Sequence, residues 1–189
     1  KPFTVTEFNY CNPNTYRMEG APLMGGYAAL QDWDGLFRFA WSHNNYAMQN
    51  LNAPRGFDIV NDPQAQLGER ILNLLFRNEY VAAARPAFAF SWTPDVLENI
   101  TSLHHCAEYP KEFSLLGLYG RIGSLNADAD FPGVRKLNVL AENWRSQLPQ
   151  NARTALDGLL ANGTITSATG EITLDAKQKT LKITVPKGE

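Results

Sequence analysis

Glu7 is the residue of this sequence whose type and surroundings point most clearly to chemistry. It follows a short β-branched and aromatic run, residues 3–6, which predicts a buried strand. Turn-forming residues follow at positions 9 and 12–14. The carboxylate therefore stands at the C-terminal end of a strand. Catalytic groups of α/β barrels occupy that end of the strands, so Glu7 is a candidate nucleophile or acid/base.

The elements that follow must position this carboxylate. Pro22 suits a first helical position, and apolar residues at helical spacing predict a helix over residues 22–33. A second strand is expected over residues 36–42, with alternate aromatic residues on one face and Trp41 at its C-terminal end. Strand, helix and strand with short connections make a βαβ unit, which implies parallel pairing and a right-handed crossover.

The clearest helix signal comes later in the chain. A loop rich in Asn, Gly, Pro and Gln is expected over residues 44–61, and Asp62 then suits the N-cap of a helix over about residues 62–78, with Pro63 at its first position. Beyond it the pattern predicts strand-like material at 85–92 and 113–122, helices at 94–101, 134–147 and 152–160, and a hairpin of residues 171–175 and 180–185.

Five segments together resemble the end of a retaining (β/α)8-barrel glycoside hydrolase of the large superfamily whose nucleophilic glutamate ends the seventh strand. The barrel-like segments are residues 2–10 (PFTVTEFNY), 27–36 (YAALQDWDGL) and 39–43 (FAWSH). Two more, residues 57–63 (FDIVNDP) and 167–172 (SATGEI), resemble the β-sandwich that follows the barrel in some bacterial members. The resemblance covers most of the chain, and its barrel motifs are more specific than its sandwich motifs.

The resemblance implies a role for individual residues. Glu7 matches the nucleophile, and Trp41 matches the tryptophan that ends the eighth strand and forms the floor of the sugar subsite. Asn9, Tyr10 and His43 would lie on loops near the sugar. Retaining hydrolysis needs two carboxyl groups about 5–5.5 Å apart and no metal or organic cofactor. An aromatic ring at a strand end also suits the C–H face of a pyranose.

The sequence departs from the family in one respect. The acid/base glutamate, which follows an asparagine at the end of the fourth strand in that superfamily, has no counterpart here. A whole barrel takes about 250 residues. We therefore expect residues 1–53 to form the last two βα units and residues 54–189 a partial β-sandwich-like domain. The chain would be a fragment, inactive alone, of a longer protein that supplies the missing N-terminal barrel segment, with an extracellular or periplasmic location favoured.

Composition restricts the other function classes. The chain has 189 residues, 44% apolar and 19% charged, and a formal net charge of −2, which predicts a globular protein without a nucleic-acid footprint. No apolar run is long enough to span a membrane, and no signal peptide or initiator methionine is present. Two cysteines, Cys11 and Cys106, match no zinc spacing, and neighbouring His104 and His105 complete no recognised ligand set.

Each candidate has a purely structural alternative. Glu7 could pair with Arg17 or Arg38, and Trp41 could be a core aromatic beside Phe37 and Phe39. Asp32 and Asp34, which flank Trp33, are expected to cap and turn the junction between helix and strand rather than to form a carboxylate pair.

A second function class stays open as well. An independent domain could bind carbohydrate or a protein partner through Trp41, Trp92 or Trp144 without catalysis.

Two open barrel strands would also leave an unpaired edge and an exposed apolar face, which predicts self-association.

Overall fold

The structure is a computed structural model of the chain, and it describes residues 2–49, 56–94, 111–138 and 141–186. The chain divides into two compact units, Lys1–Val81 and Ala82–Glu189. This division falls later than the boundary expected between residues 53 and 54. The reason is that the helix capped by Asp62 packs on the helix that follows the first strand, within the first unit.

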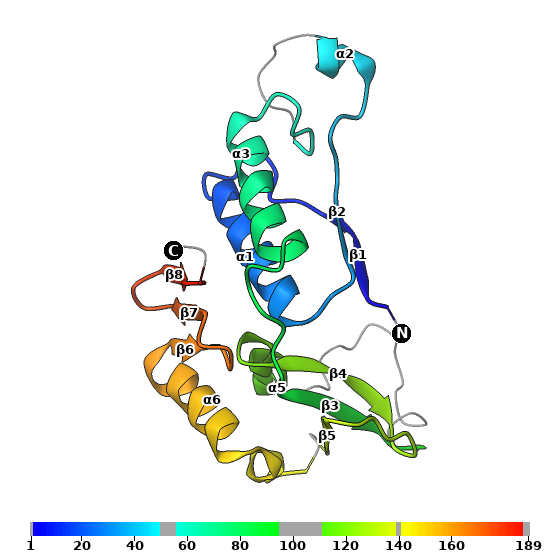
Figure 1. The fold of residues 1–189 in the computed structure, drawn as a ribbon, viewed down its shortest axis with the longest axis vertical. Coiled ribbons are helices and arrows are strands. Elements are labelled where there is room, and N and C mark those ends of the chain that lie inside the picture. The colour runs from blue at the N-terminus through cyan, green and yellow to red at the C-terminus, as the bar shows by residue number, and fades with distance from the viewer. Residues whose placement is uncertain (1, 50–55, 95–110, 139–140, 187–189) are drawn as a thin grey trace. The chain divides into compact units, whose positions relative to one another are not determined.

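The first unit is a strand–helix–strand arrangement with additional helices (Figure 1). Its elements are β1 (Thr4–Phe8), the 3₁₀ turn η1 (Arg17–Glu19), α1 (Gly20–Leu30), β2 (Gly35–Arg38), α2 (Asn45–Gln49), α3 (Pro63–Leu72) and η2 (Asn73–Arg77), a π-helical continuation of α3. β1 pairs with β2 in parallel, which confirms the predicted pairing. The predicted loop of residues 44–61 contains α2.

Close helix packing in the first unit depends on glycine. α1 and α3 lie side by side (Figure 1). A Cβ atom added to Gly25 would come within 3.1 Å of the Leu72 Cα, and one added to Gly68 within 3.0 Å of the Ala21 Cβ. The two helices approach this closely because these positions carry no side chain.

The second unit combines two sheets with one long helix. Its elements are β3 (Ala87–Trp92), α5 (Lys111–Leu115), η4 (Leu116–Leu118), β4 (Arg121–Asn126), β5 (Val134–Leu137), η5 (Trp144–Gln147), α6 (Gln150–Asn162), β6 (Thr164–Thr166), β7 (Ile172–Asp175) and β8 (Thr180–Ile183). The order β4-β3-β5 is parallel throughout, and β6-β7-β8 is antiparallel. The C-terminal hairpin and the helix near residues 152–160 are thereby confirmed.

Two predictions in this unit are wrong. Residues 134–147 do not form a helix, because residues Val134–Leu137 pair with β3 and Trp144–Gln147 make a separate 3₁₀ turn. Residues 113–122 are not one strand either, since α5 and η4 precede β4. The helix expected at 94–101 lies almost wholly outside the described residues.

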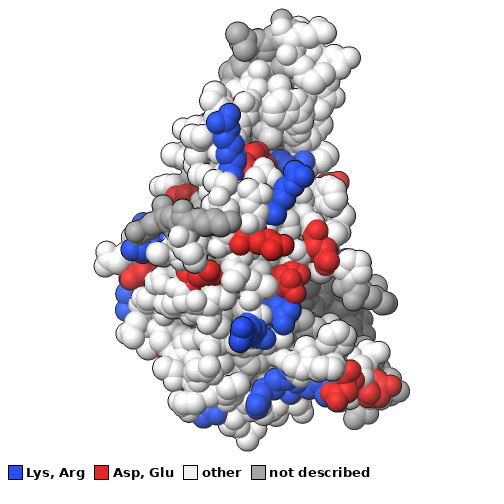
Figure 2. Space-filling view, in the orientation of Figure 1, with Lys and Arg blue, Asp and Glu red and all other residues white. Residues whose placement is uncertain are grey.

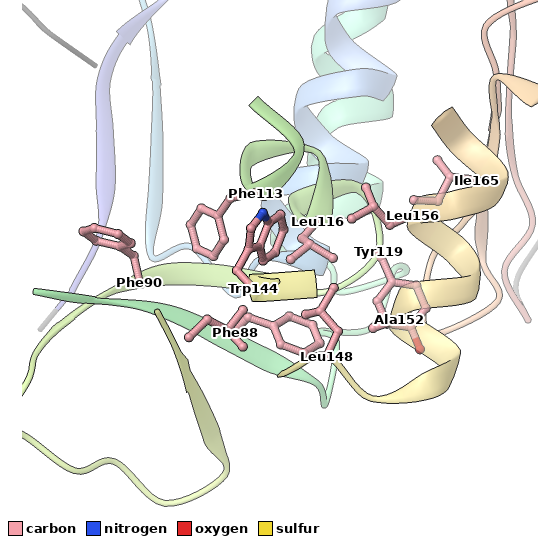
Figure 3. Close-up of a cluster of buried hydrophobic side chains, with 11 residues drawn as sticks. Phe88, Phe90, Phe113, Leu116, Tyr119, Trp144, Leu148, Ala152, Leu156 and Ile165 are labelled. Atoms are coloured by element: carbon pink, nitrogen blue, oxygen red, sulfur yellow. The ribbon is translucent and has the colours of Figure 1, made fainter. Parts of the chain in front are cut away.

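The core of the second unit is a single cluster of buried side chains drawn from both sheets and the helices between them (Figure 3). Its members are Phe88, Phe90, Phe113, Leu116, Tyr119, Leu137, Trp144, Leu148, Ala152, Leu156 and Ile165. Phe113 packs edge-on against Trp144 with ring centroids 6.4 Å apart. The parallel sheet in this unit is unlike the antiparallel sheets of a β-sandwich. The end of a (β/α)8 barrel followed by a β-sandwich stays a prediction.

Candidate functional site

The C-terminal ends of β1 and β2 lie next to each other and carry the residues singled out by the sequence. The register pairs Val5 with Leu36 and Phe8 with Arg38, with an irregularity between Val5 and Phe8. The Phe39 amide then donates to the Phe8 carbonyl at 3.0 Å. Parallel pairing thus brings the segment after β1, beginning at Glu7, beside the segment after β2.

Glu7 has an exposed side chain that no described residue binds. Both arginines suggested as its structural partners are engaged elsewhere, Arg17 with Asp62 and Arg38 with Glu69. The ion-pair alternative for Glu7 is therefore not observed, and its carboxylate is available to solvent.

Arg17 and Asp62 join η1 to the start of α3. Asp62 Oδ2 lies 2.5 Å from Arg17 Nε, and Asp62 Oδ1 accepts the Gln64 and Ala65 amides at 3.1 and 3.2 Å. This confirms the predicted N-cap. Burial alone would raise the pKa of Asp62, but Arg17 and the two amide donors outweigh it, so the pKa lies below its ordinary value.

Arg38 ends β2 and is bonded to a carboxylate of α3. Its Nη2 lies 2.8 Å from Glu69 Oε1, and its guanidinium carbon lies 5.1 Å from the centre of the Phe8 ring. Burial raises the pKa of Glu69, and Arg38 opposes that shift only in part. Arg38 therefore links the end of β2 to α3 and to the Phe8 ring at the end of β1.

Asn9 joins three segments of backbone. Its Nδ2 donates to the carbonyls of Phe39, at 2.6 Å, and Phe57, at 2.8 Å. The side chain thereby ties the end of β1 both to the segment after β2 and to the segment before α3. Asn9 was expected near the sugar, and the structure gives it this bridging position.

Tyr10 packs at the N-terminus of α1. A Cβ atom built on Gly20 would lie 2.1 Å from Tyr10 Cδ2, so the ring lies directly against the glycine backbone. Both Asn9 and Tyr10 are half-buried, and both hold the loop after β1 in place.

Trp41 lies beyond the end of β2 and is 55% exposed. The core alternative is therefore not observed, and Phe37 and Phe39 are exposed too. Trp144, by contrast, is only 6% exposed in the core of the second unit, which removes it from the possible ligand platforms. The Trp92 side chain lies outside the part of the chain that the structure describes.

His43 has a partner that the sequence analysis missed. Asp58 Oδ1 accepts the His43 amide at 3.0 Å and is also bonded to the ring nitrogen Nδ1. Asp58 is buried at 7% exposure, while the His43 side chain is 44% exposed. The sequence signal was the first of two aspartates in the motif FDIVNDP, fifteen residues beyond the histidine and without local periodicity.

An aromatic cluster surrounds this pair. The Phe39 ring meets His43 edge-on at 5.1 Å and Phe57 at 5.7 Å between ring centres. Both phenylalanines are exposed. The region after β2 therefore presents apolar rings together with one polarised imidazole.

The remaining candidates are structural or lie outside the description. Asp34 accepts the Phe3 amide at 2.7 Å, and Asp32 takes a left-handed conformation with φ of 61°, as expected for a turn between helix and strand. His104, His105 and Cys106 fall outside the described residues. Within the described ranges, no three His, Cys, Asp or Glu side chains are grouped as a metal would need, and no helix is long and apolar enough to cross a membrane.

Comparisons with known proteins found no match that bears on this site. The sequence matches no protein-family model, and neither a curated protein nor a solved structure is significantly similar to it.

Proposed function

We propose that this chain carries the nucleophile half of a retaining glycoside hydrolase site, with Glu7 as the nucleophile. The observation that supports this most is the position of Glu7, exposed at the C-terminal end of a parallel strand and paired with neither Arg17 nor Arg38. A carboxylate so placed is free to attack an anomeric carbon.

The rest of the site supports the same chemistry. Trp41 and the rings of Phe39 and Phe57 provide exposed apolar surface next to the strand ends, which suits the C–H faces of a sugar. The acid/base carboxyl is expected from a barrel segment outside this sequence. The proposed substrate is an oligo- or polysaccharide, and the two-carboxylate chemistry requires no cofactor.

The proposal is tested on the longest protein encoded by the open reading frame that contains this sequence. We expect hydrolysis of activated aryl glycosides, and we expect Glu7→Gln to lower kcat/KM by at least about 1000-fold, because the covalent intermediate can no longer form. Glu142→Gln is the matched control, since Glu142 is an exposed glutamate of the second unit. Equal activity in the two variants would contradict the proposal.

A non-catalytic carbohydrate-binding module is the second candidate. The exposed cluster of Trp41, Phe39, Phe57 and His43 favours it, because such a cluster binds a sugar whether or not a second carboxyl is present. Saccharide binding by this chain with no Glu7-dependent hydrolysis in any longer form would select the module.

A further inference from the structure

We infer that His43 and Asp58 form a subsite for an uncharged, hydroxyl-bearing ligand, in which Asp58 positions the imidazole and His43 Nε2 accepts a hydroxyl hydrogen bond. The choice of a carbohydrate as that ligand rests on the proposed function. The subsite itself rests on the geometry after β2.

Backbone pairing fixes the histidine relative to the aspartate. The Ala40 amide donates to the Phe57 carbonyl at 3.0 Å, and the Ile59 amide donates to the Ala40 carbonyl at 3.2 Å. These two bonds hold Asp58 beside Ala40. Because Asn9 also donates to the Phe57 carbonyl, the segment that carries Asp58 is held from two sides.

The carboxylate determines which ring nitrogen faces outward. Asp58 Oδ1 accepts from the His43 backbone amide, so the same oxygen beside Nδ1 acts as an acceptor there too. Nδ1 therefore carries the hydrogen, and Nε2 of the neutral ring carries a lone pair. Among the described residues none hydrogen bonds to Nε2, and the side chain is 44% exposed.

The surroundings favour a neutral ligand over an anion. Arg17 and Arg38, the arginines described near the strand ends, are both held by carboxylates. Residues 39–49 contain no Lys, Arg, Asp or Glu. On the face drawn in Figure 2, the part of the first unit around α2 shows no charged side chain. Among the described residues around His43, no Lys or Arg is free of a carboxylate partner to bind an anion, whereas a hydroxyl group needs only an acceptor.

The aromatic rings supply the other half of the recognition. Phe39, Phe57 and Trp41 expose 36%, 50% and 55% of their surface. A sugar ring has an apolar face and a hydroxyl rim, so apolar rings beside a single oriented acceptor match both features. Asp58 acts through His43 and is a positioning residue rather than a catalytic one.

The first test is nuclear magnetic resonance of the 189-residue chain at neutral pH, with His43 assigned by its loss in His43→Phe. We expect Nδ1 to carry the hydrogen in the native chain. We expect Asp58→Asn to change the tautomer balance, and Asp128→Asn, an exposed aspartate of the second unit, to leave it unchanged. Hydrogen on Nε2 in the native chain would overturn the inference.

The second test adds uncharged gluco-, galacto-, manno- and xylo-oligosaccharides, with oligogalacturonate as the anionic probe. We expect at least one neutral saccharide to shift the Nε2 signal, and its affinity to fall about tenfold or more in His43→Phe and Asp58→Asn. His43→Gln retains an acceptor and should lose less. If Asp58→Asn fails to fold, the contrast between Gln and Phe at position 43 still decides.

Three results would overturn the inference: oligogalacturonate binding alone, equal affinity in the Gln and Phe variants, or no shift up to about 10 mM of every saccharide. The proposed function fails separately. Saccharide binding at His43 without Glu7-dependent hydrolysis would contradict the nucleophile role alone. Glu7-dependent hydrolysis with an unchanged KM in His43→Phe would contradict the subsite alone.

Discussion

The two units of this chain differ in how many large apolar side chains they expose. The second unit gathers them into one buried cluster that includes Trp144. The described part of the first unit exposes eleven large hydrophobic side chains, whereas among the described residues of the second unit only Phe131 and Leu160 are exposed to that degree. Exposed aromatic rings beside an unpaired carboxylate are typical of a binding surface, whereas a closed cluster serves stability.

Ion pairs follow the reverse pattern. In the first unit, Arg17–Asp62 and Arg38–Glu69 are largely buried and tie helices to the strand ends. In the second unit, Arg145–Asp157 and Lys136–Asp130 are substantially exposed. The first unit has a small apolar core, and its buried ion pairs help to hold the exposed strand ends in place.

The largest expected effect is a difference in stability between variants of Trp144 and Trp41. Trp144→Ala should lower the free energy of unfolding by about 3–5 kcal/mol, because it empties the centre of the second unit's core. Trp41→Ala should change that free energy by less than about 0.5 kcal/mol, since its ring is exposed. Urea unfolding of both variants measures this. Equal losses of stability in the two variants would contradict the difference in burial between Trp144 and Trp41.

The buried ion pair should matter more than the exposed one. Asp62→Ala removes the cap of α3 and leaves Arg17 without its carboxylate, which should cost about 2–4 kcal/mol. Asp157→Ala is the matched control and should cost less than about 1 kcal/mol, because exposed pairs contribute little. The midpoint and slope of urea unfolding, measured for both variants, give the two losses of unfolding free energy to be compared.

The same variant has a distinctive dependence on pH. The pKa of Asp62 is lower in the folded chain than in the unfolded chain, so its stabilisation is complete above about pH 4 and is lost as the pH falls through the lower folded value. Asp62→Ala should therefore lose less stability than the native chain between about pH 4 and pH 2. A parallel decline in both proteins would contradict the role of this carboxylate.

The smallest of these effects concerns helix packing. Gly25→Val places methyl groups against the Leu72 backbone and should destabilise the first unit by about 1–3 kcal/mol. Gly123→Ala is the control, because a Cβ atom at Gly123 meets no described atom within 4 Å. Thermal unfolding would show the difference, and equal midpoints would mean that α1 and α3 do not pack as closely as described.

What the sequence predicted correctly was local in origin. Asp62 and Pro63, which are adjacent in the chain, predict the start of a helix. The short connections on both sides of α1 favour parallel pairing of β1 and β2. The hairpin of β7 and β8 follows from alternation on both sides of one turn.

What it missed depends on partners far apart in the chain. Residues Val134–Leu137 have a helix-compatible pattern, yet pairing with β3 makes them a strand. Asp58 becomes the partner of His43 only because the segment before α3 returns to the end of β2. Nothing in the local pattern distinguishes Trp41 from Trp144, since their exposure is decided by the surrounding fold.

We propose Glu7 as the nucleophile of a glycoside hydrolase. The most direct measurement is mass spectrometry of the longest encoded protein after incubation with activated 2-deoxy-2-fluoro glycosides, which trap the glycosyl-enzyme intermediate of retaining enzymes. We expect one added sugar on the peptide that contains Glu7, and none in Glu7→Gln. A label on another carboxylate, or turnover by the native protein with no label on Glu7, would contradict it.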